Sequence, residues 1–249
     1  MATALVTGAT AGIGRAIARQ LAGHGHDLVL VARDGDRLTA MAQEVSRQFR
    51  IDAEVLPADL TDLAASRLVE ARLADPDRPV EWLVNNAGFG VKEPFAGSDL
   101  DAEQAMIDVL VQAPMRLTHA ALPGMLERGR GRVLIVSSVA SFLAGGSYSA
   151  AKAWATVFAE SLSAKYRSAG VHVTALCPGY TRTEFHARAD MDISRVPQWL
   201  WLDADDVAAA GLVACAEGRA VAVPGAVYKG IHGLTQVLPR PVVRRLTGS

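Results

Sequence analysis

The sequence predicts an α/β fold of three layers, in which helices cover both faces of a doubly wound parallel sheet of seven strands. Short apolar, β-branched runs alternate along the chain with longer amphipathic segments, which is typical of consecutive β-α-β units. No Pro/Ser-rich linker, charge block or low-complexity stretch interrupts this alternation. Because 50% of the residues are hydrophobic and can fill a core, residues 1–249 are expected to form a single domain.

Composition argues against several other classes of protein. The formal net charge of −1 gives no electrostatic reason to expect nucleic acid as a partner. Cys177 and Cys215 provide neither a disulfide framework nor zinc-ligand spacing, and the histidines are scattered, so no metal site is expected. No apolar run reaches the length of a membrane span and no signal peptide precedes the first strand. We therefore expect a cytoplasmic protein that is not attached to a membrane.

The first unit, residues 1–30, is expected to be a strand, a glycine-rich loop, a helix and a second strand. The loop reads Thr7-Gly8-Ala9-Thr10-Ala11-Gly12-Ile13-Gly14. Gly8 permits a sharp turn, while Gly12 and Gly14 let the backbone approach a pyrophosphate at the N-terminus of the next helix. The glycine spacing differs from the G-x-G-x-x-G of the general dinucleotide fingerprint. Its place at the first strand–helix junction nevertheless favours a nucleotide site over a purely structural turn.

Arg33 follows directly after the second strand, residues 27–32. In a Rossmann fold this position faces the adenosine ribose, where a carboxylate binds a 2′-hydroxyl and an arginine accommodates a 2′-phosphate. Arg33 therefore predicts NADP(H) as the preferred cofactor, with NAD(H) possible, unless it is simply a solvated arginine. Asp34 comes next and offers the opposite chemistry, while Arg15 is expected to add positive charge near the phosphates.

The stretch from Arg132 to Lys152 carries the candidate reactive groups. A buried strand ends in Ser137-Ser138, and a glycine-rich turn then opens a helix with Tyr148 and Lys152 four residues apart on one face. A free tyrosine has a pKa of about 10, and a neighbouring ammonium is expected to lower it. Ser138, or its rival Ser137, could then hydrogen-bond the oxygen of a carbonyl or alcohol held against Tyr148. Taken alone, the Tyr and Lys also fit an ordinary amphipathic helix.

Several motifs that follow one another along the chain favour the reactive pair over an ordinary helix. With these motifs, the sequence resembles the short-chain dehydrogenase/reductase family from Thr7 to about Thr183. The motifs are Thr7-Gly8 with Gly12-x-Gly14, Asp59-Leu60, Asn85-Asn86-Ala87-Gly88, Ser138 with Tyr148-x-x-x-Lys152, and Pro178-Gly179 with Thr183. The resemblance implies a Rossmann sheet with strand order 3-2-1-4-5-6-7 and hydride transfer between NADP(H) and a hydrophobic carbonyl or secondary alcohol. It also implies a homodimer or homotetramer.

The resemblance further assigns roles to individual residues. Tyr148 would donate or accept the proton, Lys152 would lower its pKa and bind the ribose hydroxyls, and Ser138 would orient the substrate oxygen. Asp59 would hydrogen-bond the adenine amine, although it or Asp62 could equally cap the following helix. The expected cofactor-binding residues are Gly8, Thr10, Gly12, Ile13, Gly14, Arg33, Asp59, Leu60, Asn86, Ala87, Gly88, Tyr148, Lys152, Pro178, Gly179, Thr181 and Thr183.

The sequence departs from the family within the long helix expected over residues 99–126. Leu110 stands where the family has a catalytic asparagine, and Gln112 lies on a different face. Pro114 has no N–H, so the carbonyl of Leu110 is left without its ordinary helical bond and could hold a relay water. The spacing from Ser138 to Tyr148 is also shorter than usual in the family. An alternative function is therefore a catalytically idle cofactor-binding protein with a regulatory or scaffold role.

Two further segments are expected to border the substrate. Residues 184–202 are irregular and apolar, which fits a lid over the substrate, with core packing of Trp199 and Trp201 as the alternative. The tail, residues 226–249, mixes apolar and basic residues and contains Pro239 and Pro241. It is expected to cover the substrate cleft or pack on a neighbouring subunit rather than form an interfacial membrane helix.

Overall fold

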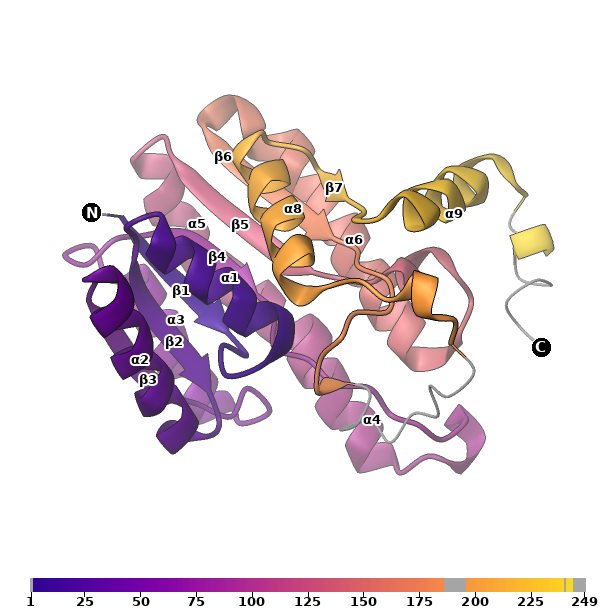
Figure 1. Ribbon diagram of the computed structural model, residues 1–249, viewed down its shortest axis with the longest axis horizontal. Coiled ribbons are helices and arrows are strands. Elements are labelled where there is room, and N and C mark those ends of the chain that lie inside the picture. The colour runs from indigo at the N-terminus through magenta and orange to yellow at the C-terminus, as the bar shows by residue number, and fades with distance from the viewer. Residues whose placement is uncertain (1, 186–195, 240, 244–249) are drawn as a thin grey trace.

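The structure of the protein, a computed structural model, describes residues 2–185, 196–239 and 241–243. Its strands form one sheet in the order β3-β2-β1-β4-β5-β6-β7, and all neighbouring strands are parallel (Figure 1). The predicted order is therefore confirmed. The strands are β1 (Thr3–Thr7), β2 (Asp27–Ala32), β3 (Ala53–Pro57), β4 (Val80–Asn85), β5 (Gly131–Val136), β6 (Val171–Leu176) and β7 (Val221–Ala222).

Helices cover both faces of the sheet and complete the three layers (Figure 1). One face is covered by α1 (Gly12–Gly23), α2 (Gly35–Phe49) and α8 (Ala204–Ala216). The other face is covered by α3 (Leu63–Ala74), α5 (Ala113–Glu127) and α6 (Gly146–Tyr166). The helix α9 (Ala226–Val237) extends away from the sheet beyond β7 (Figure 1). None of the helices in the described ranges has the length and hydropathy needed to cross a membrane.

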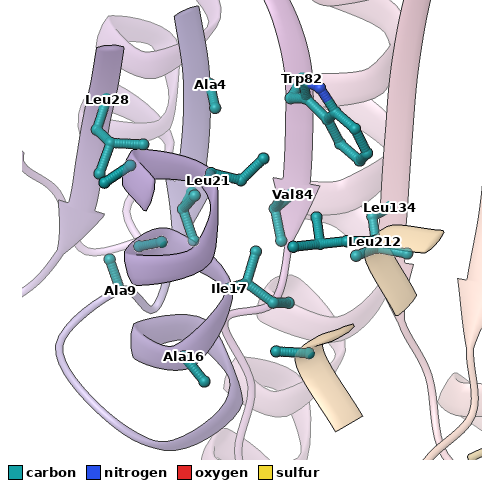
Figure 2. Close-up of a cluster of buried hydrophobic side chains, with 14 of the residues drawn as sticks. Ala4, Ala9, Ala16, Ile17, Leu21, Leu28, Trp82, Val84, Leu134 and Leu212 are labelled. Atoms are coloured by element: carbon teal, nitrogen blue, oxygen red, sulfur yellow. The ribbon is translucent and has the colours of Figure 1, made fainter. Parts of the chain in front are cut away.

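The alternation of side chains along each strand divides the core in two. In β1, Ala4 and Val6 belong to the cluster under α1, while Leu5 belongs to the cluster on the opposite face. Figure 2 shows the first cluster, where Ile17 and Leu21 of α1 face the sheet. Because helices cover both faces of the sheet, the strands are continuous apolar runs, as is typical of buried parallel strands.

The long helix predicted over residues 99–126 consists of three consecutive segments. The α-helix α4 (Leu100–Ile107) leads into a π-helical turn, η2 (Asp108–Gln112), before α5 begins. Pro114 supplies no N–H, and the N–H of Ala113 bonds the carbonyl of Asp108, five residues back. The predicted long helix is therefore present without a break, and it contains a π-helical turn just before Pro114, where the ordinary hydrogen-bond register is shifted.

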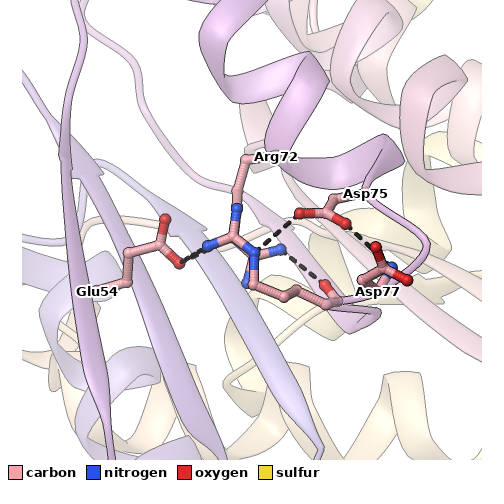
Figure 3. A network of polar contacts seen from close by, with 5 residues as sticks. Glu54, Arg72, Asp75 and Asp77 are labelled. Carbon is pink, nitrogen blue, oxygen red and sulfur yellow. Dashed lines mark hydrogen bonds and ion pairs between the residues drawn. The ribbon is translucent and has the colours of Figure 1, made fainter.

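A polar network fixes the C-terminal end of α3 against the N-terminal end of β3, at the edge of the sheet opposite the carboxyl ends of the strands (Figure 3). Arg72 is only 7% exposed, and it donates to the carboxylate of Glu54 at 2.8 Å and to the carbonyl of Arg78 at 2.7 Å. The guanidinium of Arg78 in turn contacts Asp75 at 2.8 Å. A buried arginine must be paired in this way, because an unpaired charge is costly to desolvate.

Candidate active site

The candidate site lies at the carboxyl ends of the parallel strands, where the loops after β1, β4, β5 and β6 meet. Strand order reverses between β1 and β4, and ligands of doubly wound sheets bind at such a switch point. Most of the predicted site residues lie in these loops, while Arg33 follows β2 and Asp59 and Leu60 follow β3.

The helix α1 begins at Gly12, and its N-terminus has no side-chain cap. In contrast, α2, α3, α4 and α8 are each capped by an aspartate that accepts from a backbone N–H: Asp34, Asp62, Asp99 and Asp203. The residue before α1 is Ala11, which makes no cap hydrogen bond, and the first turn of the helix contains no acidic residue. The N-terminal N–H groups of α1 are therefore left to an anion, as a dinucleotide pyrophosphate requires.

Glycine is required in this loop partly by contacts that the sequence did not reveal. Gly8 has a φ of +66°, so the predicted sharp turn is present. A Cβ at Gly12 would lie 2.8 Å from Cγ2 of Thr183, and a Cβ at Gly14 would overlap the side chain of Asn86 and the carbonyl of Gly8. The absence of a side chain at Gly12 and Gly14 thus leaves room for neighbouring protein atoms as well as for a pyrophosphate.

Asn86 ties the loop after β4 to the glycine-rich loop. Its side-chain amide donates to the carbonyls of Thr7, at 2.9 Å, and Gly8, at 3.2 Å. The hydroxyl of Thr7 accepts from the backbone N–H groups of Asn86 and Ala87 at 2.9 and 3.0 Å. These hydrogen bonds hold the Asn86-Ala87-Gly88 segment beside the glycine-rich loop.

Of the two charged residues that follow β2, the arginine is the one available to contact the adenosine part of a cofactor. Asp34 is the N-cap of α2 and accepts from the N–H of Arg37 at 3.0 Å, so its carboxylate serves the helix. Arg33 is exposed at the end of β2. Arg15 pairs with Glu44 of α2 at 2.8 Å, and its contribution to the charge near the phosphates stays a prediction.

Asp59 does not cap α3, because Asp62 accepts from the N–H of Ala64 in that role. One carboxylate oxygen of Asp59 accepts from the backbone N–H and the hydroxyl of Thr61 at 3.0 and 2.8 Å. This turn holds Asp59 at the end of β3, and the following Leu60 is buried in the core. The contact with adenine stays a prediction.

Ser137 and Ser138 point in opposite directions, as alternation along a strand requires. Ser137 is buried, and its hydroxyl lies 2.8 Å from both the carbonyl of Lys152 and the hydroxyl of Thr156. Ser138 accepts from the N–H of Ala140 at 3.1 Å, at the start of the short helix η3 (Val139–Phe142). Its hydroxyl also faces the phenol of Tyr148 closely enough to lower the pKa of that group. The geometry therefore favours Ser138 as the residue that faces a substrate.

Burial raises the pKa of Tyr148 to about 12, and the hydrogen bond from Ser138 opposes that rise. The sequence analysis expected Lys152 to lower this pKa, which the structure does not show. Lys152 lies 5.7 Å from the centre of the Tyr148 ring, and its Nζ donates to the carbonyl of Val136 at 2.7 Å. The ammonium is thus directed at the end of β5 and meets the ring face of Tyr148.

Lys152 is 5% exposed, and its burial lowers its pKa to about 8. The lysine still carries its charge at neutral pH, because its pKa remains above 7. The backbone of Gly88 lies close to it, since a Cβ there would be 3.8 Å from Nζ and only 2.7 Å from Cδ2 of Leu110. Leu110 itself is buried, so the side chain that replaces the family asparagine fills this corner with apolar atoms.

The loop after β6 runs from Pro178 to Phe185 and passes over the site. The hydroxyl of Thr181 donates to the carbonyl of Gly179 at 3.0 Å, so it serves its own turn. Thr183 packs on Gly12, and the rings of Phe185 and Tyr148 lie 6.0 Å apart. This loop therefore joins the nucleotide loop to the candidate reactive tyrosine.

Tyr228 of α9 supports that loop from the C-terminal side. Its hydroxyl donates to the carbonyl of Leu200 at 2.7 Å and accepts from the N–H of Tyr180 at 3.1 Å. Its ring occupies the space that a side chain at Gly179 would need. Farther along the helix, the ring of His232 lies tilted against that of Phe142 of η3, with 4.3 Å between the ring centres. The first part of the tail thus contacts the loop after β6 and η3, while its covering of a substrate cleft stays a prediction.

The predicted lid, residues 184–202, is described only in part, and residues 186–195 lie outside the described ranges. Trp199 is 68% exposed, so the alternative that it packs in the core was wrong. Trp201 is partly buried beside the ring of Tyr180, and its Nε1 donates to the carbonyl of Val196 at 3.4 Å. This end of the segment is folded against the loop after β6.

Sequence reasoning missed Arg37, Thr156 and Tyr228. Arg37 lies four residues after Arg33, and that spacing at a helix start was the only signal of its place near the nucleotide loop. Nothing in the sequence pointed to Tyr228, which is remote from every motif. In the described part of the chain, no group of His, Cys, Asp and Glu is placed to hold a metal ion.

An uncapped helix after a glycine loop, with Ser138, Tyr148 and the buried Lys152 near the adjacent strand ends, is the arrangement of a nicotinamide-dependent oxidoreductase with a Rossmann fold. Comparison with known proteins agrees with that class. The family model for short chain dehydrogenases matches residues 2–193. Sulfoacetaldehyde reductase 2 of Chromohalobacter salexigens is 38% identical over 186 residues, covering 73% of each chain.

Solved structures give the same result. A short-chain dehydrogenase from Sphingobium yanoikuyae in complex with NADPH has a TM-score of 0.86 at 31% identity, covering 96% of this chain and 97% of that one. The bulky-bulky ketone specific alcohol dehydrogenase from Comamonas testosteroni has a TM-score of 0.81 at 26% identity, covering 96% of both chains. The chain therefore belongs to the short-chain dehydrogenase family and is an oxidoreductase.

Proposed function

We propose that the protein is an NADP(H)-dependent oxidoreductase that interconverts a hydrophobic carbonyl compound and its secondary alcohol. The observation that carries the proposal is that Ser138 interacts with the phenol of Tyr148, lowering its pKa, while the buried ammonium of Lys152 lies 5.7 Å from the centre of the Tyr148 ring. A bound nicotinamide supplies or accepts the hydride. The protein's own task is to hold the substrate oxygen against a phenol that can transfer a proton.

The protonation states of these residues suit the reduction of a carbonyl. With a pKa of about 12, Tyr148 is protonated at neutral pH and can donate its proton to the substrate oxygen. Ser138 can hydrogen-bond the same oxygen and orient it, because its hydroxyl already meets the phenol. Lys152 is charged at neutral pH and lies beside the ring of Tyr148, where it can bind the ribose hydroxyls of the cofactor.

The preference for NADP(H) is supported by the residues after β2. The exposed Arg33 can accept a 2′-phosphate, whereas Asp34 caps α2 and is turned to the helix backbone. The likeness to a structure that contains NADPH adds support. The Arg33→Asp variant should shift preference toward NAD(H), and titration of both cofactors would test this. An unchanged ratio of affinities would place Arg33 in solvent and contradict the preference.

A hydrophobic substrate is supported by the surroundings of Tyr148. Tyr148 packs against the buried cluster of Met106, Leu110 and Ala151, and the ring of Phe185 lies 6.0 Å from its own. The similarity to an alcohol dehydrogenase specific for bulky ketones agrees with these apolar surroundings. The similarity to a sulfoacetaldehyde reductase points instead to a small anionic aldehyde. The apolar residues around Tyr148 favour the first class.

The decisive experiment is to follow NADPH oxidation with a panel that contains bulky apolar ketones, keto-esters and small anionic aldehydes. Turnover of the apolar ketones is expected, and exclusive turnover of anionic aldehydes would contradict the substrate class. The rival function is a catalytically idle cofactor-binding protein, which Leu110 supports because it replaces the family asparagine. Tight cofactor binding without turnover across the panel would establish that rival.

The homodimer or homotetramer implied by the family stays a prediction. The outward side of α6 offers an apolar surface for it, since Val157 is 63% exposed beside the stacked rings of Trp154 and Phe158. Sedimentation analysis would show whether two or four copies associate in solution.

A further inference from the structure

Three consecutive residues after β6 each contact a different part of the candidate site. Thr183 packs on Gly12 of the nucleotide loop, and Glu184 forms an ion pair with Arg37 of α2. Phe185 lies against Tyr148, with 6.0 Å between the ring centres. The N–H of Phe185 also donates to the hydroxyl of Thr183 at 3.3 Å, which closes a local turn. Residues 183–185 thus connect the nucleotide loop to the proposed acid as one compact unit.

Arg37 is the residue that holds this unit from the adenosine side. One nitrogen, Nη2, donates to Oε1 of Glu184 at 2.9 Å, and Nη1 donates to Oε2 at 3.3 Å, which is a forked, two-point contact. The same Nη2 donates to the carbonyl of Thr10 at 3.2 Å. One guanidinium therefore joins α2, the nucleotide loop and the residues after β6, although Arg37 and Glu184 are 147 positions apart.

We propose that Arg37 and Glu184 are positioning residues, which hold residues 183–185 across the cofactor cleft and thereby keep Phe185 against Tyr148. The inference rests on the proposed function for what the cleft binds. Because the contacts run to Glu184 and Thr10, the pair strengthens the binding of both NADPH and NADH. Arg33, at the end of β2, distinguishes between the two cofactors.

A competing role for Arg37 makes the opposite prediction. If Arg37 were a second ligand of the 2′-phosphate, Glu184 would compete with that phosphate for the same guanidinium. Removing the carboxylate would then tighten NADPH binding, and removing the arginine would weaken NADPH alone. The two roles are therefore separated by the response of both cofactors to both variants.

The test measures the Kd of NADPH and of NADH, by fluorescence or calorimetry, for the variants Arg37→Gln and Glu184→Gln and for the double variant. We expect each single variant to weaken both cofactors by about two- to fivefold, the range open to an exposed ion pair. The double variant should be no weaker than Arg37→Gln, because the loss of Arg37 already removes both the ion pair and the contact with Thr10. High salt should reduce the difference from the native protein.

Glu217→Gln is the matched control, because it removes a surface ion pair with Arg219 of 2.8 Å and similar exposure, away from the site. If the two test variants bind both cofactors as tightly as this control, the proposal is overturned. Weaker NADPH binding in Arg37→Gln, with tighter binding in Glu184→Gln, would overturn it in favour of the phosphate role. Melting curves verify folding of each variant.

A second readout concerns Phe185. With a substrate identified by the carbonyl panel, both variants should raise the KM for the carbonyl while kcat changes less, since Tyr148 remains in place. An equal KM in all forms would contradict the link from Arg37 to Phe185. The cofactor Kd values need no turnover, so an inactive protein would refute the proposed function while leaving the role of the ion pair open to measurement.

Discussion

The carboxyl ends of β4 and β5 are neighbours in the sheet, yet their polar residues are used in opposite ways. After β4, the amide of Asn86 is occupied by the carbonyls of Thr7 and Gly8. After β5, Tyr148 and Lys152 are buried with few partners, and their pKa values move to about 12 and about 8. The first end fixes the backbone around a nucleotide, and the second end holds groups whose protonation is sensitive to their surroundings.

The comparison teaches that the role of a strand end depends on the hydrogen bonds of its polar atoms. Where these atoms are hydrogen-bonded to backbone, the strand end holds the structure rigid, and where they are desolvated, it can take part in the reaction. A polar atom with short hydrogen bonds to backbone gains little from a ligand, whereas a desolvated group responds strongly to a new charge nearby. Changes after β4 should therefore affect folding and cofactor binding, and changes after β5 should affect turnover.

The largest expected effect is that of Tyr148→Phe, which removes the proton donor and little volume. Turnover should fall by about 10²–10⁴-fold, the usual contribution of general acid–base catalysis. The Kd of the cofactor should stay nearly unchanged. Steady-state kinetics and a binding titration on the same preparation test both statements, and a variant with native kcat would show that the end of β5 is not the reactive one.

The two consecutive serines after β5 offer a sharper test, because one is expected to affect turnover and the other stability. Ser138→Ala should lower kcat, because it removes the hydroxyl that meets Tyr148. Ser137→Ala should instead lower the free energy of unfolding by about 1–3 kcal/mol, since buried partners lose a hydrogen bond. Denaturation and kinetics on both variants decide it, and the reverse assignment would mean that the facing residue is Ser137.

At the nucleotide end, Gly14→Ala should damage folding and cofactor binding together. The new Cβ would overlap the side chain of Asn86 and the carbonyl of Gly8, and overpacking of this kind costs about 1–3 kcal/mol. Gly233→Ala is a suitable control, because a Cβ at Gly233 meets no atom within 4 Å. Native-like stability and affinity in Gly14→Ala would show that the contact between the two loops is not rigid.

The smallest effect concerns pH. Burial lowers the pKa of Lys152 from 10.5 to about 8, so the lysine is charged below about pH 8 and loses its charge as the pH rises through that value. The kcat/KM for carbonyl reduction should therefore be about half its plateau value near pH 8 and decline above it. In Lys152→Arg the charge persists, and this decline should disappear. Retention of the same inflection would assign it to another group.

Sequence reasoning succeeded where the information was local. The glycine loop, the Tyr148–Lys152 pair and the strand order follow from short motifs and their succession along the chain. The contact between Arg37 and Glu184 was not predictable, because its partners are 147 positions apart and each reads as an ordinary surface charge. The pKa of Tyr148 was mispredicted for a related reason, since desolvation depends on side chains that several elements bring together.

The intermediate case is the long helix before β5. Its apolar pattern and Pro114 were both visible in the sequence, and the loss of the ordinary bond to the Leu110 carbonyl followed from the proline. The π-helical turn at Asp108–Gln112 was not foreseen, because the helix can absorb a missing bond in more than one way. The relay water at that carbonyl stays a prediction.

Tyr228 also bears on the order in which the molecule is completed as it leaves the ribosome. Its hydroxyl joins Tyr180 and Leu200, residues 48 and 28 positions earlier in the chain, and its ring fills the space beside Gly179. The loop after β6 therefore emerges well before the side chain that supports it. The parallel sheet can assemble from N-terminal segments during synthesis. The loop after β6, in contrast, gains its support from Tyr228 only when α9 has been synthesised and has docked.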